Sequence, residues 1–288
     1  MAGPMKKPES TKTSLKGTVW LGVLAAVLLV ITNSAIWINN QIFDTENFTN
    51  TVTTSLNSEE SRNAIATGLT DRALEGRPVL RNVVGDVPVN IVGGLLGTNQ
   101  AEKAVEKVTS KIHVLVTSEQ RESVVYDISG IKSVLIQLYD TVTGLGREPK
   151  INPNNIPDEI VLIEAGKLPN FYKASVAFLW LAPLAFIGAF LALAYPYFKN
   201  PKQYRVTLAI QGGIVAFAGL LALSIGPLFK PPVLANIQTG TGRTVVENIY
   251  DAFIATFNTQ SMYLFAIGAV ALAISGGLYI YQLIRVKK

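Results

Sequence analysis

The amino-acid sequence contains no cysteine and only one histidine, His113. A chain without cysteine forms no disulfide bonds and performs no thiol chemistry, and with one histidine the common zinc sites lack their ligands. A Ser-His-Asp triad would have to use His113, and no nucleophile-elbow pattern accompanies it. His113 shares a helix face with Glu106 and Glu102, so we expect a solvated surface histidine, with pairing to one of these acids as the alternative. We therefore expect no enzyme, no metal site and no cofactor.

Charged residues are absent from four long apolar stretches, which cover residues 17–43, 174–198, 206–229 and 252–284. A helix needs about 20 apolar residues to cross the hydrocarbon core of a bilayer. We therefore predict a polytopic α-helical membrane protein whose four transmembrane helices, at 17–38, 174–195, 206–229 and 262–284, face the lipid bilayer. Their few polar residues, such as Asn33 and Gln211, argue against an ion-coupled carrier.

Positive charge is concentrated in three short segments, 1–16, 196–205 and 285–288. Together these segments hold ten of the 25 Lys and Arg and one of the 20 Asp and Glu, which leaves 15 basic against 19 acidic residues elsewhere. Basic residues in short loops mark the cytoplasmic side of a membrane. We therefore expect a multi-pass protein of the plasma membrane with both termini in the cytoplasm. The net charge of +5 then reflects topology, and we expect no nucleic-acid partner.

The first apolar stretch has a second interpretation, as a cleaved signal peptide. Four lysines precede it, and its apolar core ends near Ser34 and Ala35. However, it is long for a signal peptide, it carries Trp20 and Trp37 at its two ends, and it has Asn33 two residues before Ala35, where signal peptidase prefers a small residue. We favour an uncleaved anchor.

The predicted topology leaves residues 39–173 as one extracytoplasmic domain, which is large enough to bury a core without cross-links. Its first part contains helix signals. Three positions carry N-cap patterns: Asp44, Asn57 with Glu60 three residues later, and Asn99 with Glu102. From residue 99 onward the apolar residues follow one helix face, so we expect an amphipathic helix on the domain core.

The later part of this domain changes character. We predict a short strand at 123–128, a helix at 129–142 and a second strand at 159–164, which makes the domain α+β and mainly helical. Five carboxylates lie in this region: Asp127, Asp140, Asp158, Glu159 and Glu164. They could hold a divalent cation, but no EF-hand spacing is present, and we interpret them as solvated acids.

A shorter outer loop, 230–261, separates the last two predicted spans. Residues 240–244 resemble a small phosphate cradle but follow no strand, so a flexible turn is the better interpretation. Residues 244–258 then form an amphipathic helix joined to the last span, and Ile249, Phe253 and Phe257 are its candidate interaction residues. We expect this apolar stripe to pack on the large domain or on the membrane surface, with Glu247 on the opposite face.

Small residues recur at four-residue spacing in the predicted spans. The sets are Ala185 and Ala189; Gly212 and Ala216; Ala218, Ala222 and Gly226; and Ala269, Ala273 and Gly277. Small residues allow two membrane helices to approach closely. We expect these contacts to form within one chain, with a seam between copies of the chain as the alternative.

Several stretches follow one another in a distinctive order. They are Trp37 followed by Asp44-Thr45-Glu46-Asn47-Phe48, residues 111–116 around His113, the strand and helix of 125–138, and residues 160–168 leading directly into three spans. This arrangement resembles a family of uncharacterised integral membrane proteins, largely from actinobacteria. The resemblance covers most of the chain and implies an architecture of one N-terminal spanning helix, an extracytoplasmic domain and three C-terminal spanning helices. It implies no activity.

Taken together, these features favour a non-enzymatic protein of the bacterial cell envelope whose extracytoplasmic domain mediates binding or assembly. Its partner would be another envelope protein or a second copy of the chain. One alternative is an accessory subunit of a membrane transport or export complex, bound through the small-residue faces of the spans. The other is an enzyme acting on envelope lipids or peptidoglycan, which would need acids such as Asp127, Asp158 or Glu164 to meet in one cleft.

Overall fold

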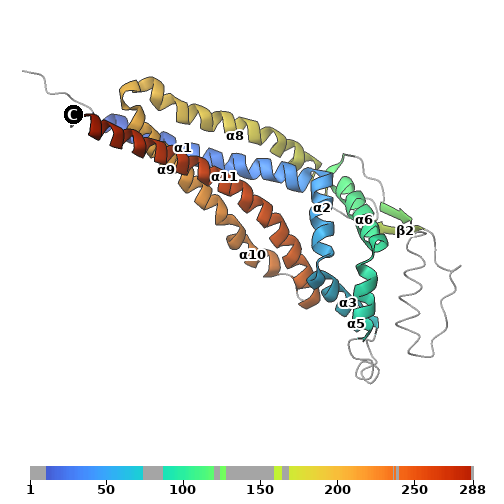
Figure 1. The fold of residues 1–288 in the computed structure, drawn as a ribbon. Helices are drawn as coiled ribbons and strands as arrows, with labels where there is room; N and C mark the ends of the chain where they lie inside the picture. Colours follow the sequence, from blue (N-terminus) through green and yellow to red (C-terminus); the bar gives the residue numbers. More distant parts are fainter. Residues whose placement is uncertain are drawn as a thin grey trace, which may run out of the picture. The chain divides into compact units, whose positions relative to one another are not determined.

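The computed structural model describes residues 11–73, 87–119, 124–127, 159–163, 169–235, 237 and 240–286. Within these residues four helical segments are long and apolar enough to cross a membrane (Figure 1): Gly17–Phe43, Tyr172–Lys199, Pro201–Ala235 and Gly240–Arg285. They agree with the four apolar stretches found in the sequence. Contacts divide the chain into two units, one comprising Met1–Ile38, Ala177–Gly226 and Thr256–Lys288, and the other comprising Asn39–Val176 and Pro227–Ala255.

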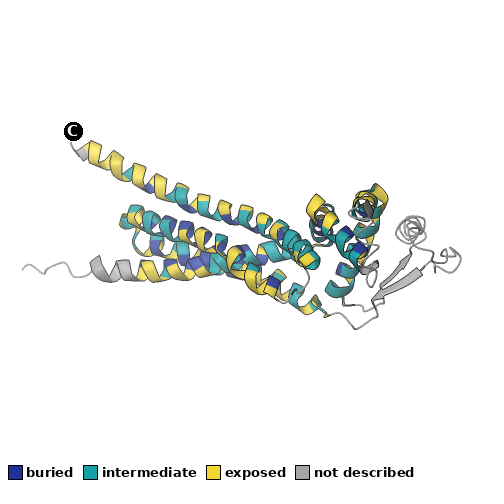
Figure 2. Ribbon diagram, turned by 90° about the horizontal axis from the view of Figure 1, so that it is seen from below, coloured by how far each residue is buried: buried dark blue, intermediate teal, exposed yellow. Residues whose placement is uncertain are grey.

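The first unit is a helical bundle. Its elements are α1 (Thr11–Trp37), α8 (Tyr172–Lys199), the 3-10 turn η3 (Pro201–Gln203), α9 (Tyr204–Leu223) and the C-terminal part of α11 (Gly240–Val286). α1 packs along α9. Figure 2 shows buried residues on the facing sides of the helices and exposed residues on the outer sides. Large apolar side chains such as Trp180, Phe190 and Tyr263 are exposed, which is the surface expected of helices that face lipid.

Helix α8 buries a stripe of small residues. Its buried positions are Ala182, Ala185, Ala189, Ala192 and Pro196, which recur every three or four residues on one face. The side-chain amide of Gln211 on α9 donates a hydrogen bond to the backbone carbonyl of Leu193 on α8, at 2.8 Å. Gln211 therefore has a partner within the bundle, as a polar group surrounded by apolar helices requires.

Glycines bring α9 and α11 into direct backbone contact. A methyl group added at Gly219 would lie 2.5 Å from the backbone nitrogen of Phe265, and one added at Gly212 would lie 3.0 Å from the carbonyl oxygen of Gly268. Gly212 therefore makes a close contact within the chain, as expected from the sequence. Its neighbours on α11 are Gly268, Ala271 and Leu272, however, whereas Ala273 and Gly277 of the set proposed for this helix are exposed.

The second unit consists mainly of shorter helices. It contains the π-helix η1 (Ile38–Phe43) that continues α1, then α2 (Thr45–Leu56), α3 (Glu59–Ala73), α5 (Val87–Leu96), α6 (Asn99–Thr117), the strands β1 (Val124–Asp127) and β2 (Glu159–Ile163), most of α10 (Ile225–Ala235) and the start of α11. α2 packs on α6, and α3 packs on α5.

The starts of α2, α3 and α6 lie within one residue of the positions expected from the sequence. Asp44 caps α2, because its carboxylate accepts a hydrogen bond from the backbone N–H of Asn47 at 2.8 Å. The other two assignments are wrong by one residue. Ser58, not Asn57, accepts from the first turn of α3, and Thr98, not Asn99, accepts from the first turn of α6. In each case a hydroxyl residue next to the asparagine takes the cap.

Strands β1 and β2 pair in an antiparallel manner, and Asp127 stands opposite Glu159 in their register. Their positions agree with the strands predicted at 123–128 and 159–164. The helix predicted at 129–142, and with it Asp140, as well as Asp158 and Glu164, lies outside the described residues.

The segment expected as an outer loop, 230–261, contains the end of α10 and the start of α11. Helix α10 extends to Ala235, and α11 is a single helix of 47 residues from Gly240 to Val286. At about 1.5 Å per residue α11 is about 70 Å long, more than twice the length needed to cross a bilayer core. Its continuity has a local cause: no glycine or proline interrupts residues 243–267.

Candidate functional site

His113 is a buried residue, which corrects the prediction of a solvated histidine. It lies on α6, and only 2% of its surface is exposed. Its Nδ1 atom is 3.0 Å from the hydroxyl of Thr45 on α2, and its Nε2 atom is 2.7 Å from the carbonyl oxygen of Ile42 on η1. Glu102 and Glu106 are exposed although they share its helix face. Thr45, the first residue of α2, contacts His113.

The contact with Ile42 assigns one hydrogen on the imidazole ring of His113. A carbonyl oxygen can only accept a hydrogen bond, so Nε2 carries the hydrogen that is donated to Ile42. Nδ1 lies within hydrogen-bond distance of the hydroxyl of Thr45. Both ring nitrogens are therefore occupied by groups of the same chain, and the ring joins the end of η1 to the first residue of α2.

Aromatic rings complete the surroundings of His113. The ring of Phe48 stacks on the imidazole with the two centroids 4.5 Å apart, and the ring of Phe253 lies 5.5 Å from that of Phe48. We call this set, consisting of Ile42, Thr45, Phe48, His113 and Phe253, the His113 cluster. It connects η1, α2, α6 and α11 in one contact group.

The three candidate interaction residues are placed on one helix, α11. Phe253 is buried at 8% exposure within the His113 cluster, whereas Ile249 is only half-buried. Phe257 is 2% exposed, and in the first unit its ring packs edge-on against Trp37 with the centroids 5.2 Å apart. Both phenylalanines therefore contact residues of their own chain.

Polar contacts that the sequence did not indicate surround the start of α11. Asn248 donates its side-chain amide to the hydroxyl of Ser61 on α3 at 2.9 Å, and Ser61 is fully buried. The ammonium group of Lys230 on α10 lies 2.7 Å from a carboxylate oxygen of Glu247 and 2.8 Å from one of Asp251. Glu247, which the sequence placed on an uninvolved face, therefore ties α10 to α11. The spacing of Glu247 and Asp251 by one helical turn is the sequence signal that could have suggested a shared cation.

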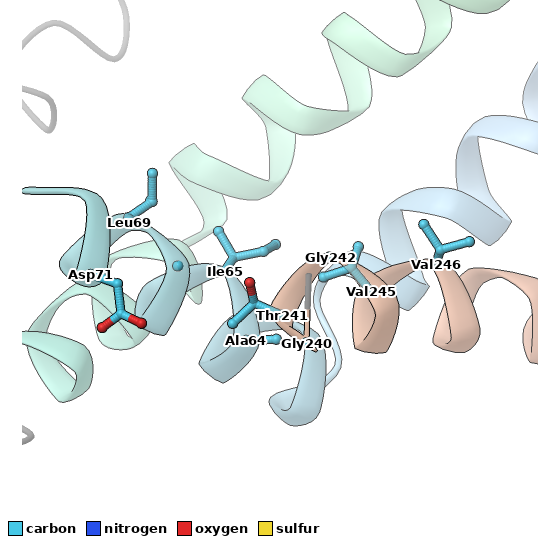
Figure 3. Close-up of a pocket in the computed structure, with 10 residues that line it drawn as sticks. Ala64, Ile65, Leu69, Asp71, Gly240, Thr241, Gly242, Val245 and Val246 are labelled. Atoms are coloured by element: carbon cyan, nitrogen blue, oxygen red, sulfur yellow. The ribbon is translucent and has the colours of Figure 1, made fainter. Parts of the chain in front are cut away.

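A groove of about 1080 Å³ separates α3 from the first turns of α11 (Figure 3). Its wall on α3 consists of Ala64, Ile65, Gly68, Leu69 and Asp71, and its wall on α11 consists of Gly240, Thr241, Gly242, Val245 and Val246. Nine of these ten side chains are uncharged. The acid Asp71 lies at one end of the groove, and Val246 lies at the other.

The glycine-containing segment 240–244 contributes to this groove as regular helix. It forms the first turn of α11, with the hydroxyl of Thr244 donating to the carbonyl of Gly240 at 3.2 Å, so the prediction of a flexible turn was wrong. The approach to the opposite wall is close, because a methyl group at Gly68 would lie 3.2 Å from the hydroxyl oxygen of Thr241. The groove therefore exists where two helices approach on small residues.

Among the described residues, no three His, Asp or Glu side chains lie close enough together to hold a metal ion. The geometry offers an apolar groove and a buried, hydrogen-bonded histidine. A comparison of the chain with known proteins finds no matching family model, no matching curated protein and no matching solved structure.

Proposed function

We propose that this chain is a non-enzymatic protein of the bacterial plasma membrane whose extracytoplasmic domain mediates binding or assembly. The second unit, with its strand pair and its helices, serves as that α+β domain, and the four apolar helices anchor it. Both termini then lie in the cytoplasm, in keeping with the distribution of Lys and Arg. The groove between α3 and α11 is the single observation that favours binding.

Three properties of the groove support this function. Its volume is that of a site able to enclose a large apolar group, and its walls are mainly aliphatic, which is typical of binding sites. Leu69 on its wall is 45% exposed, so apolar surface is available to a partner. The His113 cluster, by contrast, has both ring nitrogens occupied and almost no exposed surface, and it acts as a structural element.

Site-specific photo-cross-linking in native membranes tests this proposal. A photoreactive amino acid at Leu69 should give one discrete adduct, either at twice the mass of the chain or with a single envelope protein. The matched control is the same amino acid at Lys103, an exposed position on α6. The Ile65→Arg substitution, which introduces a charge into the groove, should abolish the adduct. Equal cross-linking at both positions, or none at Leu69, would refute a binding role for the groove.

An accessory subunit of a transport or export complex is the second candidate, and the C-terminal half of α11 favours it. Among the described residues, no atom outside the local helix backbone lies within 4 Å of a methyl group added at Gly276 or Gly277, and Tyr279 and Ile280 beside them are exposed. Such a face allows a helix of another protein to approach closely. Gly277→Leu should then disrupt a complex isolated from membranes, whereas this change should leave the adduct at Leu69 unaffected.

A further inference from the structure

The first helix, α1, is joined to α11 by hydrogen bonds between side chains inside the bundle. The side chain of Asn33 is buried, at 7% exposure, and its amide nitrogen donates to the hydroxyl of Ser261 at 3.0 Å. The side-chain amide of Gln260 donates back to Asn33, at 2.8 Å from its backbone carbonyl and 3.1 Å from its side-chain carbonyl. We call Asn33, Gln260 and Ser261 the polar lock.

One turn further along α1, a second pair of contacts reinforces the polar lock. The indole N–H of Trp37 donates to the hydroxyl of Thr256 at 2.9 Å, and its ring packs against Phe257. Asn33 and Trp37 are four residues apart and share a helix face. That face of α1 therefore meets one face of α11 through two successive turns.

Removal of α1 would take away the hydrogen-bond partners that Gln260 and Ser261 have on that helix. Ser261 is fully buried, and Gln260 directs its amide toward Asn33. An unpaired polar group inside an apolar bundle has no water to replace the lost partner. α9 would lose contacts as well, because Gly22 of α1 packs against Ile214. α1 therefore contributes both hydrogen bonds and apolar contacts to the bundle.

The same residues lie where a signal peptidase would cut. Cleavage would hydrolyse the peptide bond after Ala35, with Asn33 two residues before it. Ala35 is fully buried, and the backbone from Asn33 to Trp37 is helical and continues into η1. In the folded bundle this segment is therefore protected from proteolysis, which requires an accessible segment that opens locally.

We infer that α1 is retained as a permanent member of the bundle and that the polar lock of Asn33, Gln260 and Ser261 holds it against α11. Asn33 contributes in two ways, because it replaces the small residue that the peptidase prefers and supplies the hydrogen bonds of the polar lock. This inference does not depend on the proposed function.

Two measurements on the full chain test it. The first is the intact mass of the protein, produced in a bacterial host with active signal peptidase and purified through its C-terminal end. We expect the whole chain of 31.1 kDa, plus the tag. A product that begins at Ile36 would overturn retention.

The second measurement tests the polar lock by thermal unfolding in mild detergent. Asn33→Leu and the pair Gln260→Leu with Ser261→Ala should each lower Tm, and the three changes combined should lower it by less than the sum, because they break the same bonds. Asn40→Leu, the same change at an exposed position, is the control. Additive shifts, or a Tm in Asn33→Leu equal to that of the control, would overturn the polar lock even if α1 is retained.

Discussion

Substitution of His113 by alanine distinguishes a buried structural histidine from the solvated one that the helix pattern suggested. The change removes the donor to the carbonyl of Ile42, and a buried acceptor left without a partner costs about 1–3 kcal/mol. It also removes the stack on Phe48, a contact of about 0.5–1.5 kcal/mol, and leaves a cavity in its place. We expect the opening free energy of this region to fall by about 3 kcal/mol, within a range of about 2–5.

Hydrogen exchange measured on peptides of α2 and α6 is the appropriate assay, because it reports the local opening free energy. The three tryptophans lie at positions 20, 37 and 180, all in the first unit, so intrinsic fluorescence would not follow this region. Faster exchange should appear in both helices, since His113 lies on α6 and its partner Thr45 begins α2.

Two further variants make the test sharper. Thr45→Val removes only the hydrogen bond to Nδ1 and should cost about 1 kcal/mol. Combined with His113→Ala it should cost little more than His113→Ala alone, because the shared bond is already absent. Lys103→Ala, at an exposed position on the same helix, should change the free energy by less than about 0.5 kcal/mol. A cost below that limit for His113→Ala would refute the buried, hydrogen-bonded histidine.

Three other predictions concern the topology, the seam between α9 and α11, and the phenylalanine stripe. In intact cells, Cys introduced at Lys103 should react with a membrane-impermeant maleimide, and Cys introduced at Lys202 should not. No other cysteine of the chain can be labelled, because the sequence contains none. The opposite labelling pattern would reverse the predicted orientation. Gly268→Leu should lower the Tm in detergent substantially, because an added methyl group would already lie 2.6 Å from the Cα atom of Ala216. Gly276→Leu, at a position with no close neighbour among the described residues, should leave the Tm unchanged. Equal Tm values for the two variants would exclude the close contact. Phe253→Asp should raise the protease sensitivity of α11 near this position, because burial of a Phe is worth about 1.5–3 kcal/mol and a buried charge costs more. Ile249→Asp, at a half-buried position, should have a smaller effect. A larger effect of Ile249→Asp would contradict the packing of Phe253 on Phe48.

The hydropathy of the sequence located the four long apolar helices without reference to any contact. A run of uncharged apolar residues longer than a bilayer core is a local property of the chain, and all four runs correspond to long helices. Local signals also located the ends of elements. The Asp44 cap and the two short strands agree with the sequence, and the other caps are displaced by one residue because a neighbouring hydroxyl competes for the same N–H.

Tertiary structure decided which residues of a given face are covered. His113 and Glu106 share one side of α6, yet His113 is buried in contact with Thr45 at the start of α2, whereas Glu106 is exposed. Periodicity identifies a face but does not give the point along the helix at which a neighbour lies.

The tertiary structure also decided which residues contact one another. Gly268 and Ala273 both allow close approach, and the crossing with α9 occurs at Gly268. Glu247 was assigned to an uninvolved face because its partner, Lys230, belongs to a different helix, α10. A small residue makes a close helix contact, or a charged residue an ion pair, only where another helix of the chain lies beside it. The folded structure alone contains that information.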